Sequence, residues 1–159
     1  MFVKELTKKY DGKAVVDGVS FDIPKRSVIS MIGPNGAGKS TVLNILSRLI
    51  ARDSGLVDFE GQDISRWKSK ELAKRLAILT QSNNIQMKLT VQELVTFGRF
   101  PYSGNHVTGE DMAIVERAIQ YMELAPFRDR FIDELSGGQR QRALIAMVIA
   151  QDTEYVLLD

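Results

Sequence analysis

Nine residues near the start of the chain have the types and spacing of a phosphate-binding loop. Gly33 to Thr41 read GPNGAGKST and match the pattern G-x-x-x-x-G-K-[ST]. Glycine lacks Cβ, so such a loop can curl and point several backbone N–H groups at an anion. Lys39 would bring an ammonium group to the β- and γ-phosphates of a nucleotide, and Ser40 would offer a hydroxyl group to Mg²⁺. The alternative is a glycine-rich turn that binds nothing, although the Lys-Ser pair has no structural purpose in such a turn.

The residues on either side predict a strand before this loop and a helix after it. Val28 to Ile32 form a short apolar run that is typical of a strand. From Thr41 to Ile50, the apolar positions 42, 45, 46 and 49 follow helical spacing. The N-terminus of that helix would add its own N–H groups to the anion site.

Two single side chains stand where a ligand would be within reach. Tyr10 precedes an Asp11-Gly12 turn, where its ring can stack on a base; the alternative is a tyrosine packed at a strand end. Gln81 follows the apolar strand from Leu76 to Thr80, and ligands of open α/β sheets bind at the carboxyl ends of strands. The alternative for Gln81 is a surface amide, and the sequence leaves both questions open.

A second glycine-containing segment, Leu135 to Gln139, precedes an apolar helix that we expect to run through Ala150. Ser136 and Gln139 have the spacing of a capping box, which alone can explain them. Two adjacent glycines in a first helical turn cost about 1 kcal/mol each relative to alanine. Their presence therefore indicates a close approach of the backbone to something anionic.

The last five residues have the form of a Walker B strand. Tyr155 to Leu158 are apolar, and Asp159 closes the run with a carboxylate. In nucleotide-hydrolysing proteins an aspartate at this place holds Mg²⁺.

The other segments predict an α/β fold with two additions. Residues 1–32 indicate a small antiparallel sheet ahead of the nucleotide-binding core. Capping boxes at Thr90 and, more weakly, at Thr108 open helices, the second extending to about Leu124. Between these helices, Gly98 to Gly104 predicts an exposed loop with two aromatic residues.

We therefore expect one domain over residues 1–159, in which residues 86–135 form an inserted helical subdomain. Residues 1–85 and 136–159 would supply the β and core parts.

The composition argues against several kinds of site and partner. The net charge is +1, without the basic excess of a nucleic-acid-binding surface. There is no cysteine, which excludes disulfides and thiolate metal sites. The longest apolar run, Ala143 to Ala150, is too short to span a membrane, so we expect any membrane association to go through a partner.

Together these motifs resemble those of the ATP-binding subunits of ABC transporters. GPNGAGKST is similar to the Walker A motif, ELSGGQRQR to the ABC signature and YVLLD to Walker B. Thr80-Gln81 resembles the Q-loop, and KKYDG around Tyr10 resembles the A-loop. LTVQELVTFGRFPY, followed by a TGED helix, is similar to the group that imports iron–siderophores, haem and cobalamin. The resemblance implies a P-loop NTPase fold of the ABC ATPase type. It also implies that ATP binding and hydrolysis drive the uptake of a substrate, an iron(III)-siderophore.

The resemblance implies a role for each motif residue. Tyr10 would stack on adenine. Residues of the loop would cradle the triphosphate: Gly33, Asn35, Gly36, Gly38, Lys39, Ser40 and Thr41. Lys39, Gln81 and Asp159 would act in catalysis, and Ser40, Gln81 and Asp159 would hold Mg²⁺. The signature would contact the ATP of a second subunit through Ser136, Gly137, Gly138 and Gln139.

The resemblance also implies partners and a location. A second ATP-binding subunit would pair head to tail with this one, and both would attach to transmembrane permease subunits. A periplasmic or lipoprotein substrate-binding protein would act indirectly, and no nucleic acid would take part. The chain would lie at the cytoplasmic face of the cell membrane, held there by the permease.

Two features depart from the family pattern. The family's catalytic glutamate and switch histidine both follow the Walker B aspartate, and the sequence stops at Asp159. His106 lies in the helical subdomain and does not fit the switch role. We therefore expect a C-terminally incomplete family member that holds ATP but hydrolyses it only at a background rate. Two alternatives stay open: a nucleic-acid-linked ATPase of the ABC superfamily, and a nucleotide-binding module without turnover.

Overall fold

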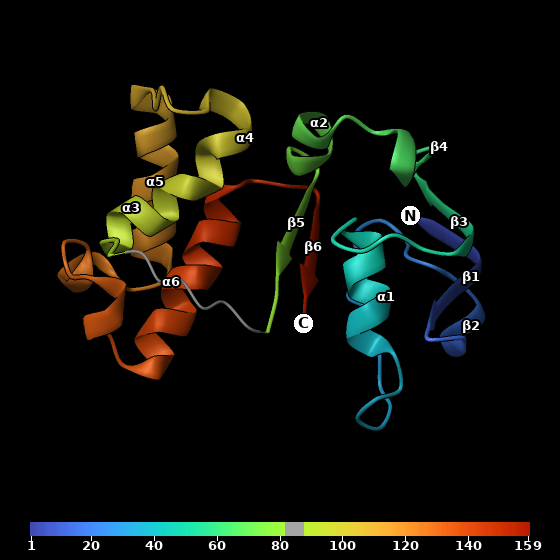
Figure 1. The fold of residues 1–159 in the computed structure, drawn as a ribbon. Helices are drawn as coiled ribbons and strands as arrows, with labels where there is room; N and C mark the ends of the chain where they lie inside the picture. Colours follow the sequence, from blue (N-terminus) through green and yellow to red (C-terminus); the bar gives the residue numbers. More distant parts are fainter. Residues whose placement is uncertain (82–87) are drawn as a thin grey trace. The chain divides into compact units, whose positions relative to one another are not determined.

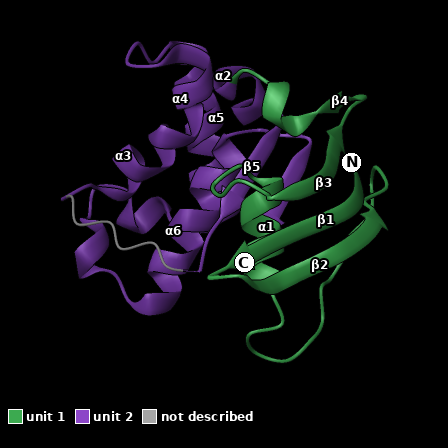
Figure 2. Cartoon of the chain, turned by 45° about the vertical axis from the view of Figure 1, so that its right-hand side comes forward, with its two compact units in different colours: residues 1–68 green, residues 69–159 purple. Residues whose placement is uncertain are grey.

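The computed structural model describes residues 1–81 and 88–159 and divides the chain into two compact units. The first unit comprises residues 1–68 and the second residues 69–159 (Figure 1 and Figure 2). An antiparallel sheet, a parallel strand pair and several helices confirm the predicted α/β class. The predicted helical subdomain, residues 86–135, begins outside the described residues, and its bounds stay a prediction.

The first unit is built on a four-stranded antiparallel sheet with the order β2-β1-β3-β4. Its strands are β1 (Phe2–Tyr10), β2 (Lys13–Asp22), β3 (Ser54–Phe59) and β4 (Gln62–Asp63). Asp11 and Gly12 join β1 to β2 with φ angles of 50° and 79°, the left-handed conformation that two-residue hairpin turns need. The predicted small antiparallel sheet is thus confirmed.

One helix supplies the apolar face that packs in this unit. Helix α1 (Lys39–Leu46) buries Val42, Ile45 and Leu46, which confirms the helical spacing, and it contacts β2. The helix ends before the predicted Ile50, because Arg48 takes a φ of 62° and turns the chain. A short 3₁₀ helix, η1 (Ile64–Arg66), follows β4.

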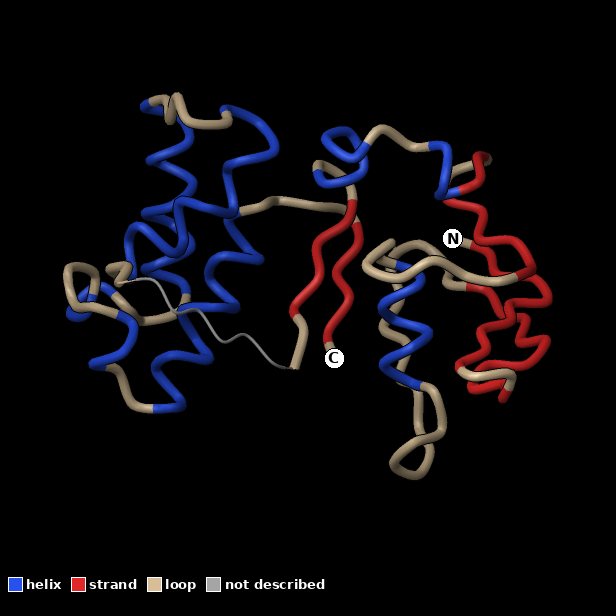
Figure 3. The backbone as a smooth tube through the Cα atoms, in the orientation of Figure 1, coloured by secondary structure: helices blue, strands red, loops and turns tan. Residues whose placement is uncertain are grey.

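The predicted strand from Val28 to Ile32 is wrong. These residues belong to the loop that leads from β2 to α1, drawn in tan in Figure 3. Val28 is 98% exposed and Ile32 95% exposed. An apolar run becomes a strand only when a neighbouring strand bonds to its backbone, and no described strand pairs with these five residues.

The second unit combines a parallel strand pair with a group of helices. Strands β5 (Leu76–Leu79) and β6 (Tyr155–Leu158) form where the sequence predicts apolar strands, and the structure pairs them in parallel. The helices, including short 3₁₀ turns, are α2 (Ser69–Ala73), α3 (Val91–Thr96), η2 (Phe97–Arg99), α4 (Phe100–Ser103), α5 (Gly109–Tyr121), η3 (Ala125–Phe127), η4 (Ile132–Glu134) and α6 (Gly137–Ala150). The apolar faces of α3, α5 and α6 share one core with η4 and β5, which includes Leu79, Leu94, Ile119, Ile132 and Leu144.

All three predicted capping boxes are confirmed. The Thr90, Thr108 and Ser136 side chains each accept a hydrogen bond from the backbone three residues on, and the side chain at that position accepts one in return. These bonds fix where α3, α5 and α6 begin, because they satisfy N–H groups that have no partner within the helix.

The predicted exposed loop from Gly98 to Gly104 is helical instead, formed by η2 and α4. Gly98 is buried against helix α6: a Cβ atom added there would lie 2.3 Å from the Met147 carbonyl oxygen. Of the two aromatic residues, Phe100 is 55% exposed, but Tyr102 bonds within its own unit. The glycine serves a close approach between helices, which sequence alone does not distinguish from a turn.

Candidate nucleotide-binding site

The predicted phosphate-binding loop has the backbone conformation that such a loop requires. Gly36 and Gly38 take φ angles of 81° and 85°, in the region that side chains disfavour. Gly38 is also buried against β2, where an added Cβ would lie 2.7 Å from the Val15 carbonyl oxygen. Space and conformation therefore both require glycine at position 38, whereas at Gly36 only the conformation does.

The Lys39 ammonium group reaches back over this loop. Its Nζ donates hydrogen bonds to the carbonyl oxygens of Gly33 at 2.9 Å and Pro34 at 2.8 Å. Both acceptors are neutral carbonyl groups, whereas a phosphate oxygen carries negative charge and would add Coulomb attraction to the ammonium group. A phosphate group in the loop would therefore compete well for this ammonium group.

Helix α1 begins without a side-chain cap of the kind that α3, α5 and α6 possess. Gly38 precedes it with no side-chain capping bond, and its first turn contains no acidic residue. No acidic side chain of the helix's own first turn therefore offsets the positive end of the helix dipole. Together with the loop conformation and Lys39, this end of α1 fits a phosphate group.

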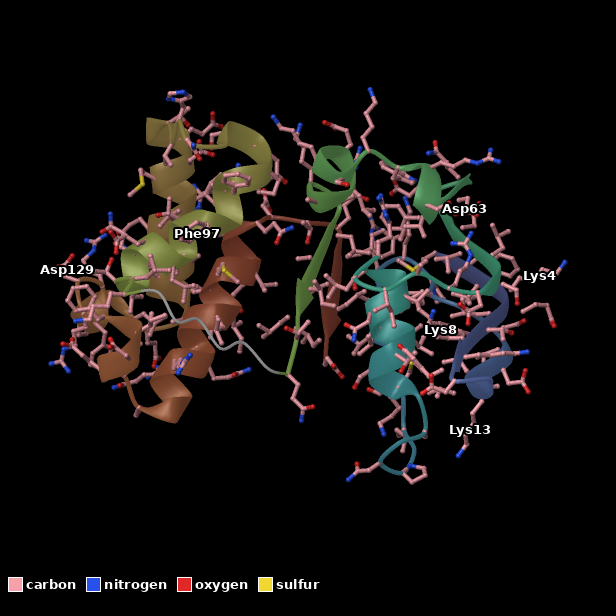
Figure 4. The ribbon with its side chains drawn as sticks, viewed as in Figure 1. Lys4, Lys8, Lys13, Asp63, Phe97 and Asp129 are labelled. Carbon is pink, nitrogen blue, oxygen red and sulfur yellow. The ribbon has the colours of Figure 1, made fainter. Side chains whose placement is uncertain are left out.

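Tyr10 lies at the end of β1 and is 47% exposed. The Lys8 ammonium group, labelled in Figure 4, lies 5.5 Å from the centroid of the Tyr10 ring. Lys8 also bonds to Asp53, and this bond, with one from the Lys9 backbone, lowers the pKa of the Asp53 carboxyl group. Part of the Tyr10 ring is therefore accessible to a ligand, as stacking on a base would need.

Gln81 and Asp159 follow the two strands of the parallel pair. The register joins Leu79 to Leu158, and the Asp159 N–H donates to the Leu79 carbonyl oxygen at 3.0 Å. Both side chains belong to exposed residues at the carboxyl edge of the pair. The structure thus brings these two predicted residues to one edge of the second unit, while the loop with Lys39 and Ser40 belongs to the first.

The structure of the segment from Leu135 to Gln139 is compatible with both interpretations of its sequence, a helix cap and a binding site for an anion. Ser136 Oγ accepts a bond from the Gln139 N–H at 3.3 Å, and Gln139 Oε1 accepts one from the Ser136 N–H at 2.9 Å. These side chains form a capping box. The glycines between them are not explained by it: a Cβ added at Gly137 or Gly138 meets no atom within 4 Å, and neither has a positive φ. Packing does not require glycine here, so an open helix start remains available to an outside anion.

Sequence reasoning missed a buried ion pair in the second unit. Arg99 Nε donates to Asp111 Oδ1 at 2.9 Å, and both side chains are 7% exposed. Asp111 was visible only as part of a capping box, and Arg99 stood in the predicted loop. The available signal in the sequence was Arg99 itself, a charged residue that stands directly after Gly98 and between aromatic residues.

The segment that leads from Gln81 toward η2 is described only in part. Asn83 and Asn84 lie outside the described residues.

Comparison with known proteins finds one family whose model covers most of these motifs. Residues 16–159 match the family model described as ABC transporter. The chain is 53% identical over 99% of its length to the petrobactin import ATP-binding protein YclP of Bacillus subtilis, and 42% identical over 98% to the ferric enterobactin transport ATP-binding protein FepC of Escherichia coli. A solved nucleotide-free ATP-binding cassette from an ABC transporter has a TM-score of 0.84 and 26% identity, covering 99% of this chain.

The matched part is shorter than these proteins. The chain spans 62% of YclP, 58% of FepC and 67% of the solved cassette.

Proposed function

The chain belongs to the ABC transporter family, and from this we propose that it is the nucleotide-binding part of an importer's ATP-binding subunit, with an iron(III)-siderophore as the transported substrate. The observation that carries the proposal is the loop at residues 33–41. Its two left-handed glycines, its bridging Lys39 and the uncapped start of α1 together fit the phosphates of a nucleotide.

The adenine ring and the phosphates of ATP each have a proposed binding group in this chain. Tyr10 stacks on the adenine ring. Lys39 neutralises the β- and γ-phosphates, and the backbone of the loop surrounds them through Gly33, Asn35, Gly36, Gly38, Ser40 and Thr41. The exposed ring of Tyr10 and the loop geometry support this assignment.

For hydrolysis, the chain offers metal ligands and phosphate charge neutralisation. Mg²⁺ prefers oxygen ligands, and Ser40, Gln81 and Asp159 each offer one. Bound Mg²⁺ would neutralise charge that develops during phosphoryl transfer. The shared strand edge of Gln81 and Asp159 supports their joint role.

A second ATP-binding subunit and a permease complete the proposed assembly. In the head-to-tail arrangement, Ser136, Gly137, Gly138 and Gln139 face the ATP of the other subunit, which the open start of α6 supports. None of the described helices has both the length and the apolar character to cross a bilayer. In the proposed assembly, permease subunits hold the chain at the cytoplasmic face of the membrane, and a substrate-binding protein delivers the substrate to them.

The substrate class rests on the named relatives. YclP and FepC are named for the import of petrobactin and the transport of ferric enterobactin, respectively. These names favour transport of an iron chelate over the nucleic-acid-linked alternative, and the net charge of +1 points the same way.

Titration of the chain with Mg-ATP tests the nucleotide site. We expect Lys39→Ala to weaken binding roughly tenfold or more, because a charge-assisted bond contributes about 1.5–3 kcal/mol. Lys70→Ala, which removes an exposed lysine of α2, is the matched control and should bind like the wild type. Equal affinities for wild type and Lys39→Ala at the same ionic strength would remove Lys39 from the site and refute the proposal.

A further inference from the structure

The Tyr102 hydroxyl group lies between the segments that lead into β5 and β6. Its oxygen is 3.3 Å from the carbonyl oxygen of Lys74 and 3.3 Å from that of Asp152. Lys74 stands two residues before β5, and Asp152 three residues before β6. One side chain from α4 therefore ties together the starts of two strands that are far apart in the sequence.

Gln151 makes a second connection at the same place. Its Nε2 donates to the carbonyl oxygen of Ala73 at 2.6 Å and lies 3.3 Å from that of Leu76. The Tyr155 N–H then donates to the Arg75 carbonyl oxygen at 3.0 Å, which begins the strand ladder. The amino-terminal end of the pair is thus held by side chains as well as by backbone bonds.

Arg99 holds the Tyr102 ring in place. The guanidinium carbon lies 3.9 Å from the ring centroid, and Nη1 donates to the Ala150 carbonyl oxygen at the end of α6 at 2.9 Å. Asp111 neutralises the guanidinium group. Hydrogen bonds from Thr108 and then from Arg99 keep the pKa of Asp111 far below its usual range, so this pair stays charged at neutral pH.

The strand pair needs such support because it is short. Each strand has four residues, and parallel pairing is slightly less stable per residue than antiparallel pairing. Val156 and Leu158 of β6 are 47% and 63% exposed, so packing restrains one face of that strand weakly. A slip of one residue would turn every side chain to the other face and displace Asp159 from the end of β5.

We propose that Tyr102, held by Arg99, is a positioning residue for Gln81 and Asp159. By fixing the starts of β5 and β6, it fixes the register that brings Gln81 and Asp159 to one edge. The inference rests on the proposed function of those two residues as Mg²⁺ ligands.

Hydrogen exchange tests whether the Tyr102 hydroxyl group holds the starts of β5 and β6 together, and this measurement needs no nucleotide. Tyr102→Phe removes the hydroxyl group but keeps the ring, and Tyr121→Phe makes the same change at a 78% exposed tyrosine of α5. We expect amide exchange at Tyr155 and Asp159 to become roughly fivefold faster in Tyr102→Phe, as for the loss of one net hydrogen bond. Tyr121→Phe should match the wild type at both amides. Equal exchange in the two variants would overturn the proposal, and so would equal acceleration throughout α5, which would indicate general loosening.

Nucleotide titrations with and without Mg²⁺ test the positioning role. We expect Tyr102→Phe to raise, roughly tenfold, the Mg²⁺ concentration that gives the half-maximal effect on ATP binding. Tenfold is the lower end of the loss of metal affinity that follows removal of groups that orient metal ligands. ATP affinity without Mg²⁺ should not change, because it depends on the loop around Lys39. An unchanged Mg²⁺ midpoint would overturn the positioning role. Failure of the wild-type chain to bind ATP at all would instead refute the proposed function. The exchange result would still decide whether Tyr102 holds the starts of β5 and β6.

Discussion

At the scale of single residues, the proposed site of the first unit would use a loop for one part of its ligand and an aromatic ring for another. The loop around Lys39 offers charge and N–H groups, which recognise phosphate but not the base. Tyr10, at the end of β1, offers an exposed ring face, which recognises a flat base but not phosphate. Substitutions of Lys39 and of Tyr10 should therefore affect ATP binding in different ways.

Tyr10→Ala should weaken Mg-ATP binding by about 1–3 kcal/mol, as for other contacts between a base and an aromatic ring, whereas Tyr10→Phe should be nearly silent. Isothermal titration measures both affinities, and the thermal midpoint is recorded for each variant. Tyr121→Ala serves as the control, since Tyr121 is exposed and lies in the second unit. A lower thermal midpoint with unchanged affinity in the folded fraction would show that Tyr10 is structural.

Among the elements, η2 and α6 depend on one glycine for their approach. An added Cβ at Gly98 would lie 2.3 Å from the Met147 carbonyl oxygen and 3.0 Å from the Gln151 nitrogen. Backbone atoms cannot move aside as a side chain can, so the two helices would have to separate. Arg99 and the carbonyl oxygen of Ala150 that it binds lie at the same contact.

Gly98→Ala should therefore lower the free energy of unfolding by about 1–3 kcal/mol, the usual cost of overpacking. Urea denaturation followed by circular dichroism measures this change. The matched control is Gly109→Ala at the start of α5, where an added Cβ meets no atom within 4 Å, and this variant should be as stable as the wild type or more stable. Equal stability of the two variants would mean that the contact between η2 and α6 is looser than described.

At the scale of the whole molecule, the second unit presents apolar surface next to its buried ion pair. Phe97, labelled in Figure 4, is 47% exposed, and Phe100 is 55% exposed. Exposed aromatic side chains of this kind favour an interface with another protein. We proposed above that the partner is a membrane permease.

A cysteine near this surface should crosslink to the permease in membranes. Asn105 is the suitable position, because it is exposed, whereas Ser103 is half-buried and bonds to the Arg99 carbonyl oxygen. Asn105→Cys should crosslink, and Tyr121→Cys at the far end of α5 should not. Crosslinks from Tyr121→Cys alone would place the interface elsewhere on this unit.

The sequence by itself determined those features that depend on neighbours a few residues away. The capping boxes at Thr90, Thr108 and Ser136 and the Asp11-Gly12 turn were all predicted, because their hydrogen bonds or φ angles involve adjacent positions. The apolar runs of β5 and β6 were also recognised from their composition, but their pairing with each other joins distant segments and was decided by the tertiary structure.

Tertiary structure decided the features whose partners are distant in sequence. Residues 28–32 have the composition of a strand but no described strand beside them, so their apolar side chains are largely exposed. Arg99 and Tyr102 looked like loop residues, yet each bonds to a carbonyl oxygen about fifty positions away, at Ala150 and Asp152. Such contacts exist only after helix α6 has packed against η2, because packing, not local propensity, brings these backbone groups within reach.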